Sequence, residues 1–346
     1  MSTLLETKEY MKKFYAKNEV YLAPLFKFIL SLIIFLLINA KIGYMERIDN
    51  FVVVLVVALF CSFMPLQITA VLAALFVLLH FYALAPECAI VAAALFLLVF
   101  LLYIRFVPKE VIVILITPVF FLLKIPYVIP IALGLLGTPV SIISVSAGVI
   151  ISYLIEYTEM NAKTISAMDT ETAITKLRFM VDGLLSNKAM LITVIAFAAT
   201  LLVVYLLRRR SMDHAWTIAI IAGALVDIMI LLVGDFFFDL NYSILGILIG
   251  TVAAGIICKL LQFFTFHLDY NRTENVQFED DEYYYYVKAV PKITVATPEK
   301  KVKKINAQRL DTPKNTGVPA SVRTAHGVTA KTKQEHPKER SERSMK

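Results

Sequence analysis

Residues 216–234 read WTIAIIAGALVDIMILLVG, 19 residues among which Asp227 is the one charged side chain. An apolar stretch of about 18 residues or more can cross the roughly 30 Å hydrocarbon core of a bilayer as an α-helix. Similar stretches recur along the chain, so lipid is the solvent for most of it. The stretch therefore predicts a membrane-spanning helix, and its repetition decides the class of fold.

The composition favours the same class. Hydrophobic residues make up 59% of the chain and charged residues 18%, with a mean hydropathy of +0.73. Soluble domains have about 45–50% apolar and about 25% charged residues. We therefore predict an all-α protein, a polytopic transmembrane helical bundle of about eight to ten spans, some of them broken, with a disordered C-terminal tail.

The chain divides into six segments. Residues 1–21 place apolar side chains at helical spacing among charges, which predicts an amphipathic cytoplasmic helix that lies on the membrane or packs on the protein. The other segments are 22–156, transmembrane helices that include broken segments at 111–156; 157–188, a polar amphipathic loop helix; 189–264, transmembrane helices; 265–296, a juxtamembrane Tyr-rich segment; and 297–346, a basic disordered tail.

The broken part, residues 111–156, is apolar sequence interrupted by prolines and glycines. Proline removes a backbone donor and clashes with the preceding turn, so short or broken helices are expected. Lys and Arg collect on the flanks that are cytoplasmic when the N-terminus is inside, which predicts a multi-pass cell-membrane protein with both termini cytoplasmic. Residues 111–156 must then cross an odd number of times. Three short crossings, or a re-entrant hairpin and one crossing, satisfy this.

Ionisable side chains inside spans are the candidate functional groups, because a charge at the bilayer centre costs about 2.5–3.5 kcal/mol on insertion scales. Asp227 follows the small residues 222–224, which allow close helix approach. Lys124 is the candidate partner of opposite charge, and His80 lies nearer the end of a span. A proton or cation site and a structural ion pair with Lys124 are both open for Asp227.

The Tyr-rich segment contains FEDDEYYYYVKAVP at residues 278–291, whose aromatic and β-branched residues favour a strand or hairpin at the cytoplasmic face. Its tyrosines form a candidate docking edge for a partner or, alternatively, an interfacial belt. With the last span, the segment resembles uncharacterised multipass membrane proteins of clostridial bacteria, some of them labelled transporter permeases. That resemblance implies no catalytic residue. The candidate docking residues are Tyr283, Tyr284, Tyr285 and Tyr286.

The tail is strongly basic. Residues 298–346 hold 13 Lys and Arg and 5 acidic residues, a net charge of +8. Low hydrophobicity and high charge predict disorder, and anionic lipid headgroups are candidate partners besides the lipid bilayer itself. Another membrane or cytosolic subunit is a further candidate. No aromatic residue interleaves the bases, so specific nucleic-acid binding is not expected.

Motifs of soluble enzymes do not occur. The chain has no GxxxxGK[ST], GxGxxG, HExxH or GxSxG pattern, and its five histidines do not follow metal-ligand spacing. We therefore expect no catalytic residue, cofactor or metal, and no enzyme. Helices broken by proline and glycine around a charged residue favour a transporter or permease-like subunit. The alternative is a non-catalytic membrane scaffold that recruits partners through its Tyr-rich segment and basic tail.

Reporter fusions test the predicted orientation. The scheme places the 157–188 loop outside and the C-terminus inside, because Lys- and Arg-rich flanks stay cytoplasmic. A reporter that is active only in the cytoplasm is expected to be active at the C-terminus and inactive after residue 185. Activity at both sites, or at neither, would contradict the scheme.

Overall fold

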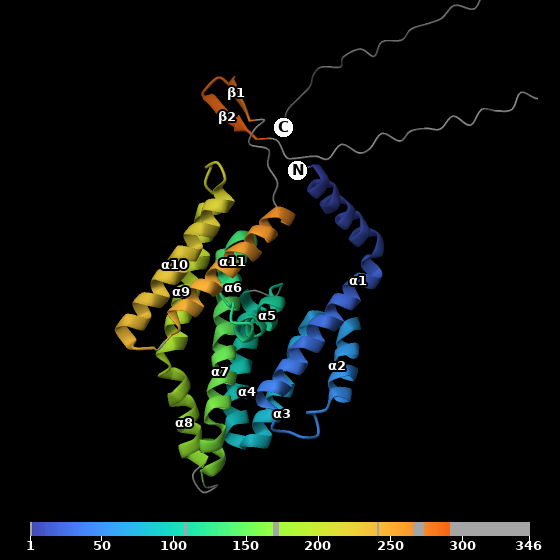
Figure 1. Ribbon diagram of the computed structural model, residues 1–346, viewed down its shortest axis with the longest axis vertical. Helices are drawn as coiled ribbons and strands as arrows, with labels where there is room; N and C mark the ends of the chain where they lie inside the picture. Colours follow the sequence, from blue (N-terminus) through green and yellow to red (C-terminus); the bar gives the residue numbers. More distant parts are fainter. Residues whose placement is uncertain (1, 107–108, 169–172, 241, 266–272, 291–346) are drawn as a thin grey trace, which may run out of the picture. The chain divides into compact units, whose positions relative to one another are not determined.

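The chain is almost entirely helical in the described ranges, apart from one antiparallel hairpin (Figure 1). Seven of its helices are long and apolar enough to cross a membrane. The predicted class, an all-α polytopic transmembrane bundle, is confirmed. The tail, residues 297–346, lies outside the described residues. The computed structural model describes residues 2–106, 109–168, 173–240, 242–265 and 273–290.

Helix α1 (Ser2–Ile42) contains both the predicted N-terminal helix and the first span. It is kinked at Asn18 (φ −114°, ψ 19°), where Asn18 Nδ2 donates to the carbonyl of Phe14 at 3.0 Å. Before and after the kink, Met11, Phe14, Tyr15 and Tyr21 are 42–80% exposed, so this stripe does not pack on the described part of the protein. The exposed stripe is compatible with a position on the membrane surface.

Helix α2 (Phe51–Phe63) returns beside α1, and Ser62 Oγ donates to the carbonyl of Pro24 at 2.8 Å. Helices α3 (Leu66–Leu84) and α4 (Pro86–Phe106) follow as a pair joined by one extended residue. The proline that opens α4 stands where a missing N–H costs no helical hydrogen bond. These helices bury the core of the N-terminal half.

Helices α5 (Val111–Leu122) and α6 (Val128–Leu136) are too short to cross a bilayer. At 1.5 Å per residue they extend only about 18 and 14 Å. The Glu110 carboxylate, just before α5, accepts hydrogen bonds from Ser141 Oγ at 2.6 Å and Ser144 Oγ at 2.9 Å. The chain therefore enters α5 and leaves α6 at the same end of the bundle. This is the geometry of the re-entrant hairpin rather than of three short crossings.

The turn between α5 and α6 is a Schellman motif. The N–H of Lys124 donates to the carbonyl of Phe121, and the N–H of Ile125 donates to the carbonyl of Phe120, both at 3.0 Å. Lys124 has φ 58°, the left-handed conformation that this motif requires and that glycine usually occupies. Pro126 follows, and it cannot continue a helix. The motif ends α5 halfway through a span.

Helix α7 (Ile142–Ala167) follows a short 3-10 turn, η1 (Pro139–Ser141), and is long enough to cross. Helix α8 (Ala173–Leu185) packs against α4 and α7 and leads into α9 (Lys188–Arg208), as Figure 1 shows. The predicted loop helix at 157–188 therefore begins inside α7 and includes α8. Residues 169–172 of this predicted segment lie outside the described ranges.

Helices α10 (Ala215–Phe238) and α11 (Ile244–Thr265) complete the C-terminal half. A Cβ on Gly223 would lie 2.3 Å from Val204 Cγ2, and one on Gly234 would lie 2.4 Å from another α9 side chain. Small residues thus bring α10 close to α9, as the sequence predicts for residues 222–224.

Two contacts fix which helix ends lie together. The Arg208 guanidinium, at the end of α9, donates to the carbonyls of Leu135 and Gly137, the latter at 2.6 Å. Lys8 Nζ, in the first turns of α1, donates to the carbonyl of Phe263 in the last turn of α11 at 2.6 Å. The start of α1 and the end of α11 therefore lie at the same end of the bundle.

The predicted hairpin is confirmed. Strands β1 (Glu274–Glu279) and β2 (Tyr284–Ala289) pair in antiparallel register, with Phe278 opposite Tyr285. Lys288 Nζ lies 2.8 Å from an Asp213 carboxylate oxygen in the turn between α9 and α10. This exposed ion pair joins the hairpin to that turn.

The left-handed turn at Lys124 predicts a stabilising substitution. Lys124→Gly is expected to raise the free energy of unfolding by about 1 kcal/mol, because the left-handed conformation costs about 1–2 kcal/mol for a residue with a Cβ. Thermal unfolding in detergent measures the change. Leu123→Gly is the matched control, since Leu123 has ordinary helical geometry (φ −71°), and it should destabilise the fold. Equal effects of the two substitutions would contradict the assignment of the turn.

Candidate functional site

Asp227 lies near the middle of α10 and is fully buried. Gly223, one turn earlier on the same face, approaches α9 closely and lies near Ile131 of α6. The Thr200 side chain of α9 lies beside the Asp227 carboxyl, and Tyr127, just before α6, interacts with it electrostatically. The carboxyl therefore lies where α6, α9 and α10 meet.

The Asp227 carboxyl has no charged partner among the described residues, and the polar group beside it is the Thr200 hydroxyl. Neither of its oxygens has a hydrogen-bond partner among the described residues, and the Thr200 hydroxyl beside it has none there either. An isolated buried charge costs far more free energy than a paired one, and in proteins such a group is neutralised instead. The carboxyl is therefore expected to carry a proton or a bound cation.

The predicted ion pair between Asp227 and Lys124 is wrong. In the described ranges, the ion pairs are Lys41–Glu159 and Lys288–Asp213. Lys124 is exposed at the tip of the α5–α6 hairpin and lines a cavity on the α5 side, whereas Asp227 is buried against the α6 side. The two arms of the hairpin therefore face different surroundings, with Lys124 at the cavity and Asp227 beside α6.

His80 has a structural role. Its Nδ1 accepts a hydrogen bond from the N–H of Met45 at 3.2 Å, so Nε2 carries the proton and donates to Asn39 Oδ1 at 3.0 Å. Asn39 Nδ2 in turn donates to the carbonyl of Ile48 at 3.0 Å. The fully buried imidazole thus joins the ends of α1 and α3 to the loop between α1 and α2.

The four tyrosines of the Tyr-rich segment are exposed. The Tyr285 ring stacks on Phe278 with centroids 4.9 Å apart, and its hydroxyl donates to Asp280 Oδ2 at 2.9 Å. The N–H groups of Glu282 and Tyr283 donate to Asp280 Oδ1. These bonds, with the Glu282 N–H first, lower the pKa of Asp280, while the contact with this carboxylate raises the pKa of Tyr285. Tyr284 and Tyr286 point to the opposite face of β2 from Tyr285.

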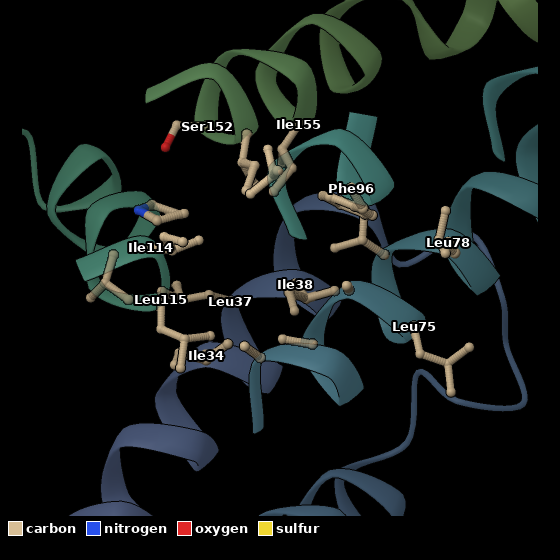
Figure 2. A pocket seen from close by; sticks show the side chains of 18 of the residues that line it. Ile34, Leu37, Ile38, Leu75, Leu78, Phe96, Ile114, Leu115, Ser152 and Ile155 are labelled. Carbon is tan, nitrogen blue, oxygen red and sulfur yellow. The ribbon is translucent and has the colours of Figure 1, made fainter. Parts of the chain in front are cut away.

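A cavity of about 760 Å³ lies between α1, α3, α4, α5 and α7. Figure 2 shows apolar side chains from all five helices pointing into it, among them Ile34, Leu78, Phe96, Leu115 and Ile155. No sequence pattern indicates this cavity, because it depends on how five helices pack together.

Charged groups also line this cavity. Lys41 Nζ, near the end of α1, contacts both Glu159 carboxylate oxygens at 2.8 and 3.1 Å. Glu156 lies one turn earlier on α7, and Lys124 lies at the end of α5. Neither Glu156 nor Lys124 forms an ion pair or side-chain hydrogen bond within the part of the chain that the structure describes. Two unpaired charges of opposite sign therefore line an apolar cavity.

The fold and these groups define an integral membrane protein with buried polar groups at membrane depth. Comparison with models of protein families, with curated proteins and with solved structures gives no match for this chain. The resemblance of the Tyr-rich segment to clostridial membrane proteins remains an expectation.

A double-mutant cycle tests the separation of Asp227 from Lys124. Lys124→Met, Asp227→Asn and the double variant are compared by thermal unfolding in detergent. Their effects on the free energy of unfolding should add to within about 0.5 kcal/mol, since sites that share no contact or partner are additive. A coupling energy above about 1 kcal/mol would restore the ion pair.

Proposed function

We propose that this protein is a transporter or permease-like subunit in which Asp227 takes up and releases a proton. The observation that carries the proposal is the fully buried Asp227 carboxyl, without a hydrogen-bond partner in the described ranges, in the middle of a span-length helix. A structural carboxyl at this depth would be paired, because an unpaired charge at membrane depth costs several kcal/mol. Ionisable groups inside spans mark ion pathways and proton relays in membrane proteins.

A proton suits this site better than a metal cation. The polar side chains placed beside the carboxyl are Thr200 and Tyr127, which supply one hydroxyl each. Calcium takes about six to eight oxygen ligands, and magnesium takes six in octahedral geometry. One carboxyl and two hydroxyls fall short of these numbers, whereas a proton needs only the carboxyl.

The re-entrant hairpin connects the surroundings of Asp227 mechanically with the cavity. Its α6 arm packs on α9, where a Cβ on Gly134 would lie 2.5 Å from Val204 Cβ. Its α5 arm packs on α7, where a Cβ on Gly148 would lie 2.6 Å from Thr117 Cβ. The glycines let the backbones approach so closely that a shift of α6 would move α9, and a shift of α5 would move α7. Half-membrane helices beside a charged group form midplane binding sites in secondary transporters.

The exposed β1–β2 hairpin favours a second candidate, a scaffold. Both strands are fully exposed, and each has an outer edge that a partner strand could join. Tyrosine also supplies large contact area with one polar group. Partner binding through this hairpin would be unaffected by changes at Asp227, so the two candidates separate experimentally.

Asp227→Asn tests the transport proposal. The amide keeps the shape of the carboxyl but cannot titrate, so the melting temperature should stay close to that of the unmodified protein while proton-linked activity is lost. Infrared difference spectra should show the band of a protonated carboxyl in the unmodified protein, and the variant should lack it. Everted vesicles should lose a respiration-driven pH gradient when a transported compound from a metabolite panel is added.

The same measurements decide against the proposal in two cases. A folded Asp227→Asn variant that dissipates the gradient as the unmodified protein does would remove the role of Asp227. A panel without any active compound, together with proteins bound specifically by the β1–β2 hairpin, would favour the scaffold. Asp239→Asn is the matched control, because Asp239 lies at the end of α10, and it should leave both readouts unchanged.

A further inference from the structure

The cavity between α1, α3, α4, α5 and α7 has the dimensions of a ligand site. Its volume of about 760 Å³ falls within the range of about 300–1,000 Å³ that small-molecule sites occupy. Its walls are mainly aliphatic and aromatic (Figure 2). An apolar wall of this kind accepts hydrocarbon, and hydrocarbon alone would give no reason for charged groups in the lining.

Glu156 and Lys124 both line the cavity shortly after one contact between α5 and α7. Helices α5 and α7 start together at the Glu110 contact, and the rings of Phe121 and Tyr153 lie 5.8 Å apart between centroids. Lys124 follows Phe121 by three residues, and Glu156 follows Tyr153 by three. Each charge thus follows the same contact by three residues, Glu156 within α7 and Lys124 in the turn that ends α5.

The two charges stay apart although they have opposite signs. Lys41 donates its hydrogen bonds to both Glu159 oxygens and interacts with Glu156 only electrostatically, without an ion-pair contact. Within the described ranges the Glu156 carboxylate and the Lys124 ammonium make no ion pair with each other or with another residue. A ligand that carries one anionic and one cationic group would satisfy both at once.

We propose that this cavity binds a zwitterionic phospholipid with a primary amine, its acyl chain among the apolar walls, its phosphate at Lys124 and its ammonium at Glu156. A primary ammonium has three donors for the acceptor-only carboxylate, whereas a quaternary ammonium has none. The lysine ammonium is a point charge that suits a phosphate. The binding site stands on its own geometry, while lipid as the transported substrate rests on the proposed function.

Binding of defined lipids to the delipidated full-length protein tests this site by native mass spectrometry. The probes are phosphatidylethanolamine, phosphatidylcholine and phosphatidylglycerol with identical acyl chains. The unmodified protein should bind phosphatidylethanolamine about tenfold more tightly than the other two, as one charge-assisted hydrogen bond predicts. Equal binding of the three lipids would overturn the proposal and show that only bulk lipid fills the cavity.

Substitutions assign the two charges. Glu156→Gln should abolish the preference for phosphatidylethanolamine over phosphatidylglycerol, and Lys124→Met should weaken binding of all three phospholipids about tenfold. Glu19→Gln and Lys109→Met are exposed controls outside the cavity and should change nothing. An unchanged lipid preference in a folded Glu156→Gln variant would overturn the proposal.

Asp227→Asn distinguishes failure of this inference from failure of the transport proposal. The variant should bind phosphatidylethanolamine as the unmodified protein does, because Asp227 does not line the cavity. It should lose movement of fluorescent phosphatidylethanolamine between the leaflets of proteoliposomes. If the Asp227→Asn variant binds phosphatidylethanolamine and moves it between the leaflets as the unmodified protein does, only the role of Asp227 would be rejected. If the unmodified protein shows no preference for phosphatidylethanolamine, the lipid site alone would be rejected.

Discussion

The interaction on which the rest of the structure depends is the satisfaction of backbone groups where α5 and α6 stop halfway through a span. In hydrocarbon every N–H and carbonyl needs a partner within the protein, so an interrupted helix is stable only where its ends are capped. The Schellman motif at Lys124 supplies the caps at the tip of the hairpin, and Arg208 supplies donors to the carbonyls of Leu135 and Gly137 at its base. At the start of α5, the Glu110 carboxylate accepts hydrogen bonds from Ser141 and Ser144 and so joins the two ends of the hairpin.

Because the hairpin is capped in this way, it can separate two packing regions. Its α5 arm faces the N-terminal helices and lines the cavity, while its α6 arm joins α9, α10 and α11 around Asp227. Glycines make both contacts close: Gly148 on the α5 side, and Gly134 and Gly223 on the α6 side. Association of helices in lipid depends on such close packing. Apolar side chains gain little free energy when they exchange contact with lipid for contact with one another.

Hydropathy was sufficient to predict the class of fold, the one charge within residues 216–234 and the broken region, because span length and proline chemistry are local properties. It left the crossing number of residues 111–156 open, since that depends on the meeting of Glu110 with Ser141 and Ser144, which no periodicity encodes. The predicted ion pair between Asp227 and Lys124 was wrong for the same reason. The sequence shows that each charge lies within an apolar stretch and that their signs are opposite, but it does not show on which side of the hairpin each one lies. The cavity could not be predicted because it depends on the packing of five helices, which hydropathy does not encode.

The pattern of pairing separates structural from functional charges. His80, Arg208 and the Lys41–Glu159 pair have hydrogen-bond partners that fix loops or helix ends, so their roles need no ligand. Asp227, Glu156 and Lys124 have no such partners in the described ranges. Burial of the unpaired Asp227 carboxyl costs stability, and the exposed Glu156 and Lys124 make no ion pair in the described ranges, so stability alone gives no reason to keep these three. A proton for the first and a zwitterion for the other two would each supply the missing partner, and the hairpin packs beside both, with α6 near Asp227 and α5 in the wall of the cavity.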